Sequence, residues 1–134
     1  TKFYACHTYH SRPAIRIENA SNISLEDVTI HSQPGMGIVG HRSENIVMKG
    51  LRVVPGPGEH FSTNTDATHF TSCKGTIRFE GCTFEGHGDD ATNVHTYYHS
   101  ITKKLSDTQY EIRLEAPTGT HSQTPDYPDK GDVL

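Results

Sequence analysis

Apolar and polar residues alternate in three stretches of the chain that share one internal spacing. The stretches cover residues 22–30, 45–53 and 76–84. Each has an Ile near its start, an apolar residue or Cys five positions later, and an apolar residue seven positions later (Ile23, Val28 and Ile30; Ile46, Leu51 and Val53; Ile77, Cys82 and Phe84). Alternation that breaks at a polar or Gly position predicts two short β-strands joined by a tight bend in each stretch.

The distance between the stretches predicts a repeat of about 23 to 24 residues. Their first Ile residues lie 46 − 23 = 23 and 77 − 46 = 31 positions apart, and the excess falls in residues 55–60, which have the Pro and Gly composition of a loop. Counting back seven positions from Ile46, Ile77 and Ile101 also reaches an apolar residue each time, so we expect these residues to be equivalent (Val39, Phe70 and Val94).

A repeat of this kind predicts an all-β solenoid. Leucine-rich repeats would show a lattice of Leu and Asn, and helical repeats would show a 3.6-residue period, but this chain has neither pattern. Short strands rich in Ile, Val and Phe favour a parallel β-helix, in which successive coils stack about 4.8 Å apart. We expect Phe70 and Val94 to point into the coil, and His69 and Asn93 to point outward.

The pattern changes near residue 100. Residues 100–105 and 109–115 alternate on either side of a polar turn, which predicts an antiparallel hairpin with one solvated face. We therefore assign residues 1–101 to parallel β-helix coils, truncated at the N-terminus, and residues 102–134 to the start of an inserted or following β module. The chain begins at Thr1 without Met and ends within an apparent strand, so we expect it to be part of a longer protein.

Composition narrows the range of functions. The 134 residues are enough for one modest domain, and 32% hydrophobic residues without Trp suit a repetitive β architecture better than a large globular core. With 16 acidic and 12 basic residues, the chain lacks the basic patch that nucleic acid or an anionic membrane would require. No apolar run approaches the roughly 20 residues of a membrane span. Three cysteines, an odd number, leave at least one unpaired within the chain.

Two copies of a short acidic motif occur where the repeat predicts neighbouring coils. Asp66 and Asp90 lie 90 − 66 = 24 residues apart, and each is followed by Ala, Thr, a polar residue and an apolar residue. We therefore expect the two carboxylates to stack on adjacent coils, and Asp89 adds a third. Burying unpaired carboxylates is costly, so we expect a bend that turns all three to the outer surface.

Three carboxylates in one patch can perform acid and base catalysis. Like charges held close together favour a state in which one acid stays protonated near neutral pH while the others remain charged. A protonated donor beside charged acceptors suits hydrolysis of a glycosidic bond, and an inverting enzyme holds the two carboxyl groups about 6.5 to 9.5 Å apart to admit a water. His69, Asn93 and His95 are close in sequence and are candidates for contacting a sugar.

Two other interpretations of the acidic patch stay open at this point. Asp and Asn at the bends of a β-helix commonly satisfy backbone groups, which would make the acids structural caps. Asp clusters can also bind calcium, although the chain has no regular run of oxygen ligands and its histidines are scattered. His87, between two Gly residues, is most simply a turn residue.

Two motifs in the chain resemble a known family. Residues 63–70 (Thr-Asn-Thr-Asp-Ala-Thr-His-Phe), with Cys-Lys-Gly at 73–75 and Phe-Glu-Gly-His-Gly-Asp-Asp-Ala-Thr-Asn-Val-His at 84–95, are similar to family 110 glycoside hydrolases. These are exo-acting α-galactosidases that remove terminal α-1,3-linked galactose. Residues 120–124 and 131–133 also resemble this family. Inverting polygalacturonases are more distant relatives with similar Asn-Thr-Asp and Gly-Asp-Asp signals, but Ala67 stands where they usually have Gly.

The resemblance implies a right-handed parallel β-helix of the pectin-lyase-like fold that enters a β-barrel module. It also implies an inverting exo-α-galactosidase that uses neither a metal nor another cofactor. By position, Asp89 would protonate the departing glycosidic oxygen, while Asp66 and Asp90 would hold and deprotonate the attacking water.

The substrate implied by the resemblance is a terminal α-galactoside of an oligosaccharide or glycoconjugate, with no nucleic acid or membrane partner. The implied location is secreted, periplasmic or at the cell surface. The alternatives are a non-catalytic β-helix that binds carbohydrate or mediates adhesion, and a polygalacturonase-like hydrolase.

Overall fold

The computed structural model describes residues 12–97, 99–113 and 126–131. Two compact units make up the chain, Thr1–His95 and Thr96–Leu134. The described residues form short strands joined by turns, bends and irregular segments. Among these residues there is no helix long and apolar enough to cross a membrane.

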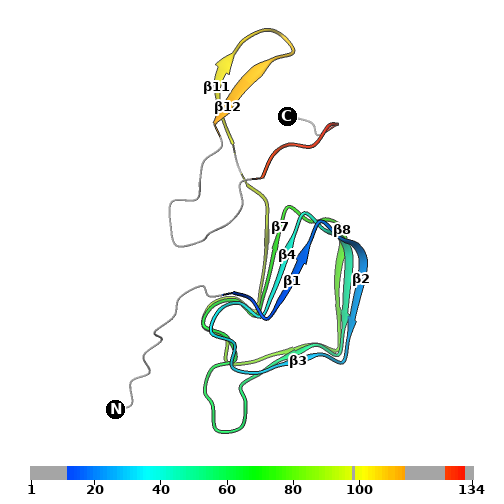
Figure 1. Ribbon diagram of the computed structural model, residues 1–134, viewed down its shortest axis with the longest axis vertical. Coiled ribbons are helices and arrows are strands. Elements are labelled where there is room, and N and C mark those ends of the chain that lie inside the picture. The colour runs from blue at the N-terminus through cyan, green and yellow to red at the C-terminus, as the bar shows by residue number, and fades with distance from the viewer. Residues whose placement is uncertain (1–11, 98, 114–125, 132–134) are drawn as a thin grey trace, which may run out of the picture. The chain divides into compact units, whose positions relative to one another are not determined.

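The first unit contains three parallel sheets (Figure 1). The chain visits the sheets in turn, so each full coil contributes one strand to each of them. The first sheet contains β1 (Ile15–Glu18), β4 (Ile38–His41), β7 (Thr68–Thr71) and β10 (Thr92–His95). The second contains β2 (Ser21–Glu26), β5 (Glu44–Lys49) and β8 (Lys74–Glu80), and the third contains β3 (Thr29–Ile30), β6 (Arg52–Val53) and β9 (Thr83–Phe84). This is the predicted all-β parallel β-helix.

The bend between the second and third sheets explains why the apolar alternation breaks in each stretch. Asp27, Gly50 and Gly81 occupy this bend with φ values of 53°, 60° and 59°. Positive φ is strained for most side chains, and Gly and Asp tolerate it better than β-branched residues. A side chain at Gly50 would also place its Cβ 2.5 Å from Asp27 Oδ1 of the preceding coil, so the stacking of the bends restricts this position further.

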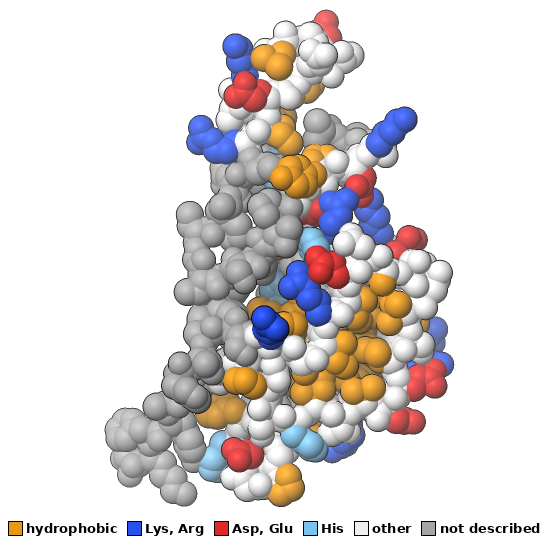
Figure 2. Space-filling view, viewed as in Figure 1, with side chains coloured by type: hydrophobic (Ala, Val, Ile, Leu, Met, Phe, Trp, Pro, Cys, Tyr) orange, Lys and Arg blue, Asp and Glu red, His pale blue; other side chains and the backbone are white. Residues whose placement is uncertain are grey.

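The interior of the coils is a continuous apolar core. Ile38, Ile46, Leu51, Val53 and Phe70 have no exposed surface. Along the stack, hydrophobic side chains gather in the middle of the coil unit, and charged side chains gather at its rim (Figure 2). The lean composition is sufficient because each coil adds only a few inward residues, which pack on those of the next coil.

Most of the predicted register is confirmed. Ile23 pairs with Ile46 and Ile46 with Ile77, while Ile30 pairs with Val53 and Val53 with Phe84. Phe70 pairs with Val94, as expected.

The predicted equivalence of Val39 with Phe70 is wrong. Gly40 pairs with Phe70, and Val39 pairs with His69. A side chain at Gly40 would collide with the Phe70 ring, so the pairing requires a residue without Cβ.

An extra residue in β8 causes this error. Glu44 pairs with Lys74, 74 − 44 = 30 positions away, whereas Ile46 pairs with Ile77, 77 − 46 = 31 positions away. The long spacing therefore does not come entirely from the loop, because one of the additional residues lies in β8. The seven positions that separate Phe70 from Ile77 consequently overshoot by one when counted back from Ile46, and reach Val39 in place of Gly40.

The second unit contains the predicted hairpin. β11 (Ser100–Lys104) pairs antiparallel with β12 (Tyr110–Arg113). Assignment of residues 102–134 to a β-barrel-like module stays a prediction, and the family-like segment 120–124 lies outside the described residues.

The cysteines that can be described are free thiols. Cys73 and Cys82 are half-buried and pack against the apolar core. Burial raises the pKa of the Cys73 thiol, which favours its neutral form. Both residues therefore serve as small hydrophobic side chains, as expected, and Cys6 lies outside the described residues.

Candidate active site

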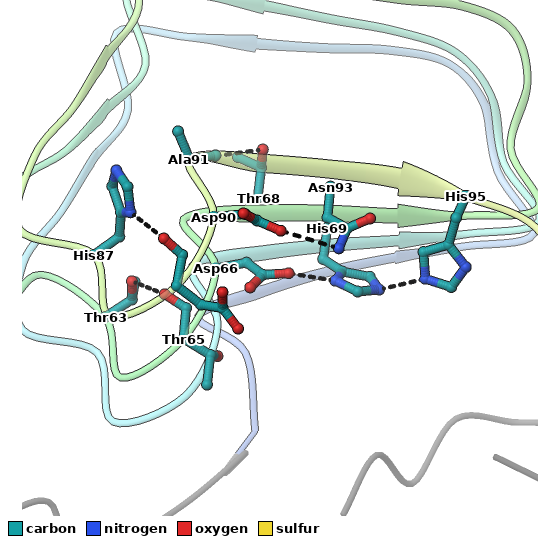
Figure 3. A network of polar contacts seen from close by, with 11 residues as sticks. Thr63, Thr65, Asp66, Thr68, His69, His87, Asp90, Ala91, Asn93 and His95 are labelled. Atoms are coloured by element: carbon teal, nitrogen blue, oxygen red, sulfur yellow. Dashed lines mark hydrogen bonds and ion pairs between the residues drawn. The ribbon is translucent and has the colours of Figure 1, made fainter. Parts of the chain in front are cut away.

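Two stacked turns carry the three acids, and Figure 3 labels Asp66 on the first turn and Asp90 on the second. Residues 63–67 lead into β7, and residues 87–91 lead into β10. Thr63 forms parallel bridges with Gln33 on one side and His87 on the other. The Ala67 N–H donates to the Asp90 carbonyl at 2.9 Å, and the Gly37 N–H donates to the Asp66 carbonyl at 3.1 Å. The sequence-predicted stacking of Asp66 on Asp90 is thereby confirmed.

Local hydrogen bonds fix the shape of each turn. Thr63 Oγ1 donates to the Thr65 carbonyl at 2.7 Å, and His87 Nδ1 donates to the Asp89 carbonyl at 2.8 Å. His87 is therefore a turn residue, as predicted. The Gly88 N–H is shared between the Thr63 and Thr65 carbonyls at 3.1 and 3.2 Å. A Cβ at Gly88 would collide with the Asn64 carbonyl, so the two turns approach each other closely only because this residue is Gly.

The three carboxylates converge in one cluster. One oxygen each of Asp66, Asp89 and Asp90 lies within 4.8 Å of the other two. Asp89 and Asp90 are exposed, as expected, whereas Asp66 is only 3% exposed. The expectation that all three acids face solvent is therefore wrong for Asp66. Its burial is tolerated because a nitrogen donor satisfies the carboxylate.

The donor to Asp66 is the imidazole of His69. His69 Nδ1 lies 2.5 Å from Asp66 Oδ2, and His69 Nε2 lies 3.0 Å from His95 Nε2. The two rings meet edge to face, with centroids 5.0 Å apart and planes at 89°. Figure 3 shows His69 between Asp66 and His95 on the outer face of the first sheet.

Asp90 has a different partner at the equivalent position. Asn93 pairs with His69 in the sheet, and its Nδ2 donates to Asp90 Oδ2 at 3.2 Å. In both coils the acid is thus bound by the side chain three residues later, first an imidazole and then an amide. His69, Asn93 and His95, the candidates for sugar contacts, all lie at the acids, and their contact with a sugar stays a prediction.

Sequence reasoning did not anticipate two features of the site. The contact between His69 and His95 is diagonal, because His69 is in register with Asn93 and His95 with Thr71. The sequence signal for this contact was the placement of His69 and His95 on the same outer face of neighbouring strands. In addition, Thr65 Oγ1 is buried and has no hydrogen-bond partner among the described residues, although Thr65 stands where Asp89 stands in the next coil.

The cluster offers three oxygen ligands to a cation. Calcium takes six to eight oxygen ligands, whereas the side chains around these acids include two imidazoles. This donor set does not favour calcium. The view that no metal takes part stays a prediction.

No protein-family model matches the chain. Several curated proteins, however, match the chain. Over 93 residues the chain is 36% identical to the alpha-1,3-galactosidase A of Shewanella woodyi, a match that covers 68% of this chain and 15% of that protein. It is 39% identical over 98 residues to an alpha-1,3-galactosidase B of Bacteroides fragilis, covering 71% of this chain and 16% of that protein. The chain belongs to the alpha-1,3-galactosidase family.

A further member of the family matches a longer part of the chain. The alpha-1,3-galactosidase B of Parabacteroides distasonis is 36% identical over 108 residues, which are 78% of this chain and 18% of that protein. The resemblance to family 110 glycoside hydrolases is thus confirmed. The chain spans only about 15% to 18% of the length of these relatives.

Proposed function

We propose that this chain carries the catalytic carboxylates of an exo-acting α-galactosidase that removes terminal α-linked galactose, with α-1,3 as the preferred linkage. The observation that carries the proposal is the convergence of Asp66, Asp89 and Asp90 from two stacked turns. The relatives are alpha-1,3-galactosidases, which supports galactose as the sugar and α-1,3 as the linkage.

The proposed reaction is a single displacement with inversion. Asp89 is exposed and donates its proton to the glycosidic oxygen as the bond to the anomeric carbon breaks. Asp66 and Asp90 hold a water and accept its proton as the water oxygen attacks the same carbon from the opposite face. The products are β-galactose and the shortened glycan, and solvent later returns a proton to Asp89 and removes one from the base.

The spacing of the acids bears on this mechanism. The nearest oxygens lie within 4.8 Å, which is closer than the separation of about 6.5 to 9.5 Å between carboxyl groups that admits a water in an inverting enzyme. Asp89 is exposed, so its side chain has room to rotate away from Asp66. The proposal requires this rotation when substrate binds.

The alternative role of the acids as structural caps finds less support. Caps of this kind exist in the fold, since Asn45 Oδ1 accepts the backbone N–H of Thr76 at 3.2 Å. Among the described residues, however, no backbone N–H donates to the carboxylates of Asp66, Asp89 or Asp90. Because these carboxylates accept no backbone N–H from the described part of the chain, they are better explained as catalytic groups than as caps.

The test is to incubate the full-length protein with an α-1,3-galactosyl disaccharide and follow the product by proton NMR. We expect β-galactose as the first product. Initial release of α-galactose would contradict inversion, and failure to release galactose from any α-galactoside would contradict the enzyme proposal. A secreted, periplasmic or cell-surface location stays a prediction.

A further inference from the structure

The two stacked acids are held by chemically different donors, and this difference suggests a role for the histidines. We propose that His69 is a positioning residue that holds the Asp66 carboxylate in place by a hydrogen bond, and that His95 fixes His69 in turn. This inference rests on the proposed function, because it assigns to Asp66 the part of the base. Under this proposal His69 holds Asp66 and does not contact the sugar.

The donors and acceptors that each side chain offers determine where the protons lie between Asp66, His69 and His95. A carboxylate only accepts, so His69 Nδ1 carries the proton of the 2.5 Å contact with Asp66. In neutral His69 the other nitrogen, Nε2, is then an acceptor, and His95 Nε2 must donate to it across 3.0 Å. Each imidazole is thereby held in one tautomer. Both ring nitrogens of His69 are engaged and the residue is only 4% exposed, so a sugar hydroxyl finds no free nitrogen on it.

The surroundings of Asp66 show why a donor is needed there. In the preceding coil, the position equivalent to Asp66 is Met36, and the position equivalent to His69 is Val39. Neither side chain can hydrogen bond strongly to a carboxylate. Asp89 and Asp90 add negative charge nearby. His69 is therefore the donor that satisfies the buried carboxylate of Asp66.

The neighbouring coil supplies the template for a conservative variant. Asn93 lies in register with His69 and donates to Asp90 in the same way that His69 donates to Asp66. His69→Asn should therefore keep a donor to Asp66, whereas His69→Ala removes it. His41 provides a matched control, because it is a buried histidine on the same sheet whose Nδ1 bonds Thr71 Oγ1 at 2.8 Å and does not reach the acids.

The experiment compares these variants in the full-length protein with an α-1,3-galactosyl disaccharide. We expect His69→Ala to lower kcat by about 10- to 100-fold, the loss of one charge-assisted hydrogen bond, with KM nearly unchanged. His69→Asn should recover most of this loss, His95→Ala should lower kcat by a smaller factor, and His41→Asn should leave kcat unchanged. A rise in KM at constant kcat in the His69 variants would assign His69 to sugar binding and overturn the proposal, as would wild-type kcat in His69→Ala.

A second measurement does not depend on activity. A proton shared between His69 Nδ1 and a carboxylate at 2.5 Å should give an exchange-protected, strongly downfield proton NMR signal. We expect Asp66→Asn and His69→Asn to remove this signal and Asp90→Asn to leave it. If the signal is absent, or persists in Asp66→Asn, the positioning role is wrong. If it behaves as expected in a protein that cleaves no α-galactoside, the contact stands and only the proposed function fails.

Discussion

The turns at residues 63–67 and 87–91 have nearly the same backbone path but hold their acids differently. In the first turn Asp66 is buried and bound to an imidazole, and Thr65 precedes it. In the second turn Asp90 is exposed and bound to an amide, and Asp89 precedes it. At equivalent positions the turns differ in two side chains, Thr65 against Asp89 and His69 against Asn93. The second turn also leads into β10, the edge strand of the first sheet, so Asp66 is sheltered between coils while Asp89 and Asp90 face solvent at the edge of the described stack.

This difference shows how a repetitive fold builds an asymmetric site. Stacking fixes the backbone positions to within hydrogen-bond distance, as the bond from Ala67 to the Asp90 carbonyl shows. Substitutions within one coil can then specialise it without disturbing the next coil. In the proposed mechanism the sheltered Asp66 helps to hold and deprotonate the water, and the exposed Asp89 can follow the leaving group as proton donor.

Replacing the acids should give the largest effect. In Asp66→Asn, Asp89→Asn and Asp90→Asn we expect galactoside hydrolysis to fall by about 10²- to 10⁴-fold, because each variant removes an acid or base. The effect on the free energy of unfolding should differ between the two turns. Asp66→Asn should lower the free energy of unfolding by about 1–2 kcal/mol, because a buried charge-assisted hydrogen bond is weakened.

Asp89→Asn provides the comparison for that stability measurement. It is an exposed change and should stay within about 0.5 kcal/mol of the wild type in urea unfolding. A large loss of stability in Asp89→Asn and Asp90→Asn, together with retained activity, would instead support the capping interpretation.

Gly88→Ala should disrupt the contact between the two turns. Its Cβ would meet the backbone carbonyl of Asn64, which cannot move without separating the turns, so we expect a loss of about 1–3 kcal/mol in the free energy of unfolding together with a loss of activity. Gly56→Ala is the matched control, because its nearest neighbour would be Ser32 Oγ at an ordinary 3.5 Å. Equal thermal melting temperatures for the two variants would show that the turns do not need close approach.

Thr65→Val tests the position that differs from Asp89. The Thr65 hydroxyl is buried without a partner, so replacing it with a methyl group of similar shape should raise the free energy of unfolding by about 1 kcal/mol. Thr63→Val removes a hydroxyl that does have a partner, the Thr65 carbonyl at 2.7 Å, and should destabilise by a similar amount. If Thr65→Val instead lowers kcat strongly, its hydroxyl contributes to the reaction.

Asn93→Ala should have the smallest effect on stability. The hydrogen bond from Asn93 to Asp90 is long, at 3.2 Å, and exposed, so chemical unfolding should change by no more than about 0.5 kcal/mol. If Asn93 contacts the sugar, KM will rise while the melting temperature is unchanged. An unchanged KM would remove Asn93 from the substrate-binding set.

The fold could be predicted from the sequence wherever inward positions are apolar and regularly spaced. Ile23, Ile46 and Ile77 determined the register because a β-helix demands an apolar residue at each inward position. The prediction was wrong at Gly40, where the inward residue is small because Phe70 fills the space. A missing side chain leaves no apolar signal, and the extra residue in β8 moved the count onto Val39.

The site was predictable in its members but not in their contacts. Repetition of the motif identified Asp66 and Asp90 as stacked residues, because stacking follows from backbone register. Burial of Asp66 and the contact between His69 and His95 depend on side-chain directions between coils, which spacing along the chain does not determine.

The loop before the first acidic turn has a consequence for how such a site can diversify. From the last residue of the third-sheet strand to the bridging residue there are 33 − 30 = 3 and 87 − 84 = 3 positions in two coils, but 63 − 53 = 10 in the coil between them. The longer segment leaves the stack and rejoins it at Thr63 without changing the pairing of neighbouring strands. Insertions and deletions at this corner can therefore change the loop that precedes the first acidic turn while the acids keep their places in the stack.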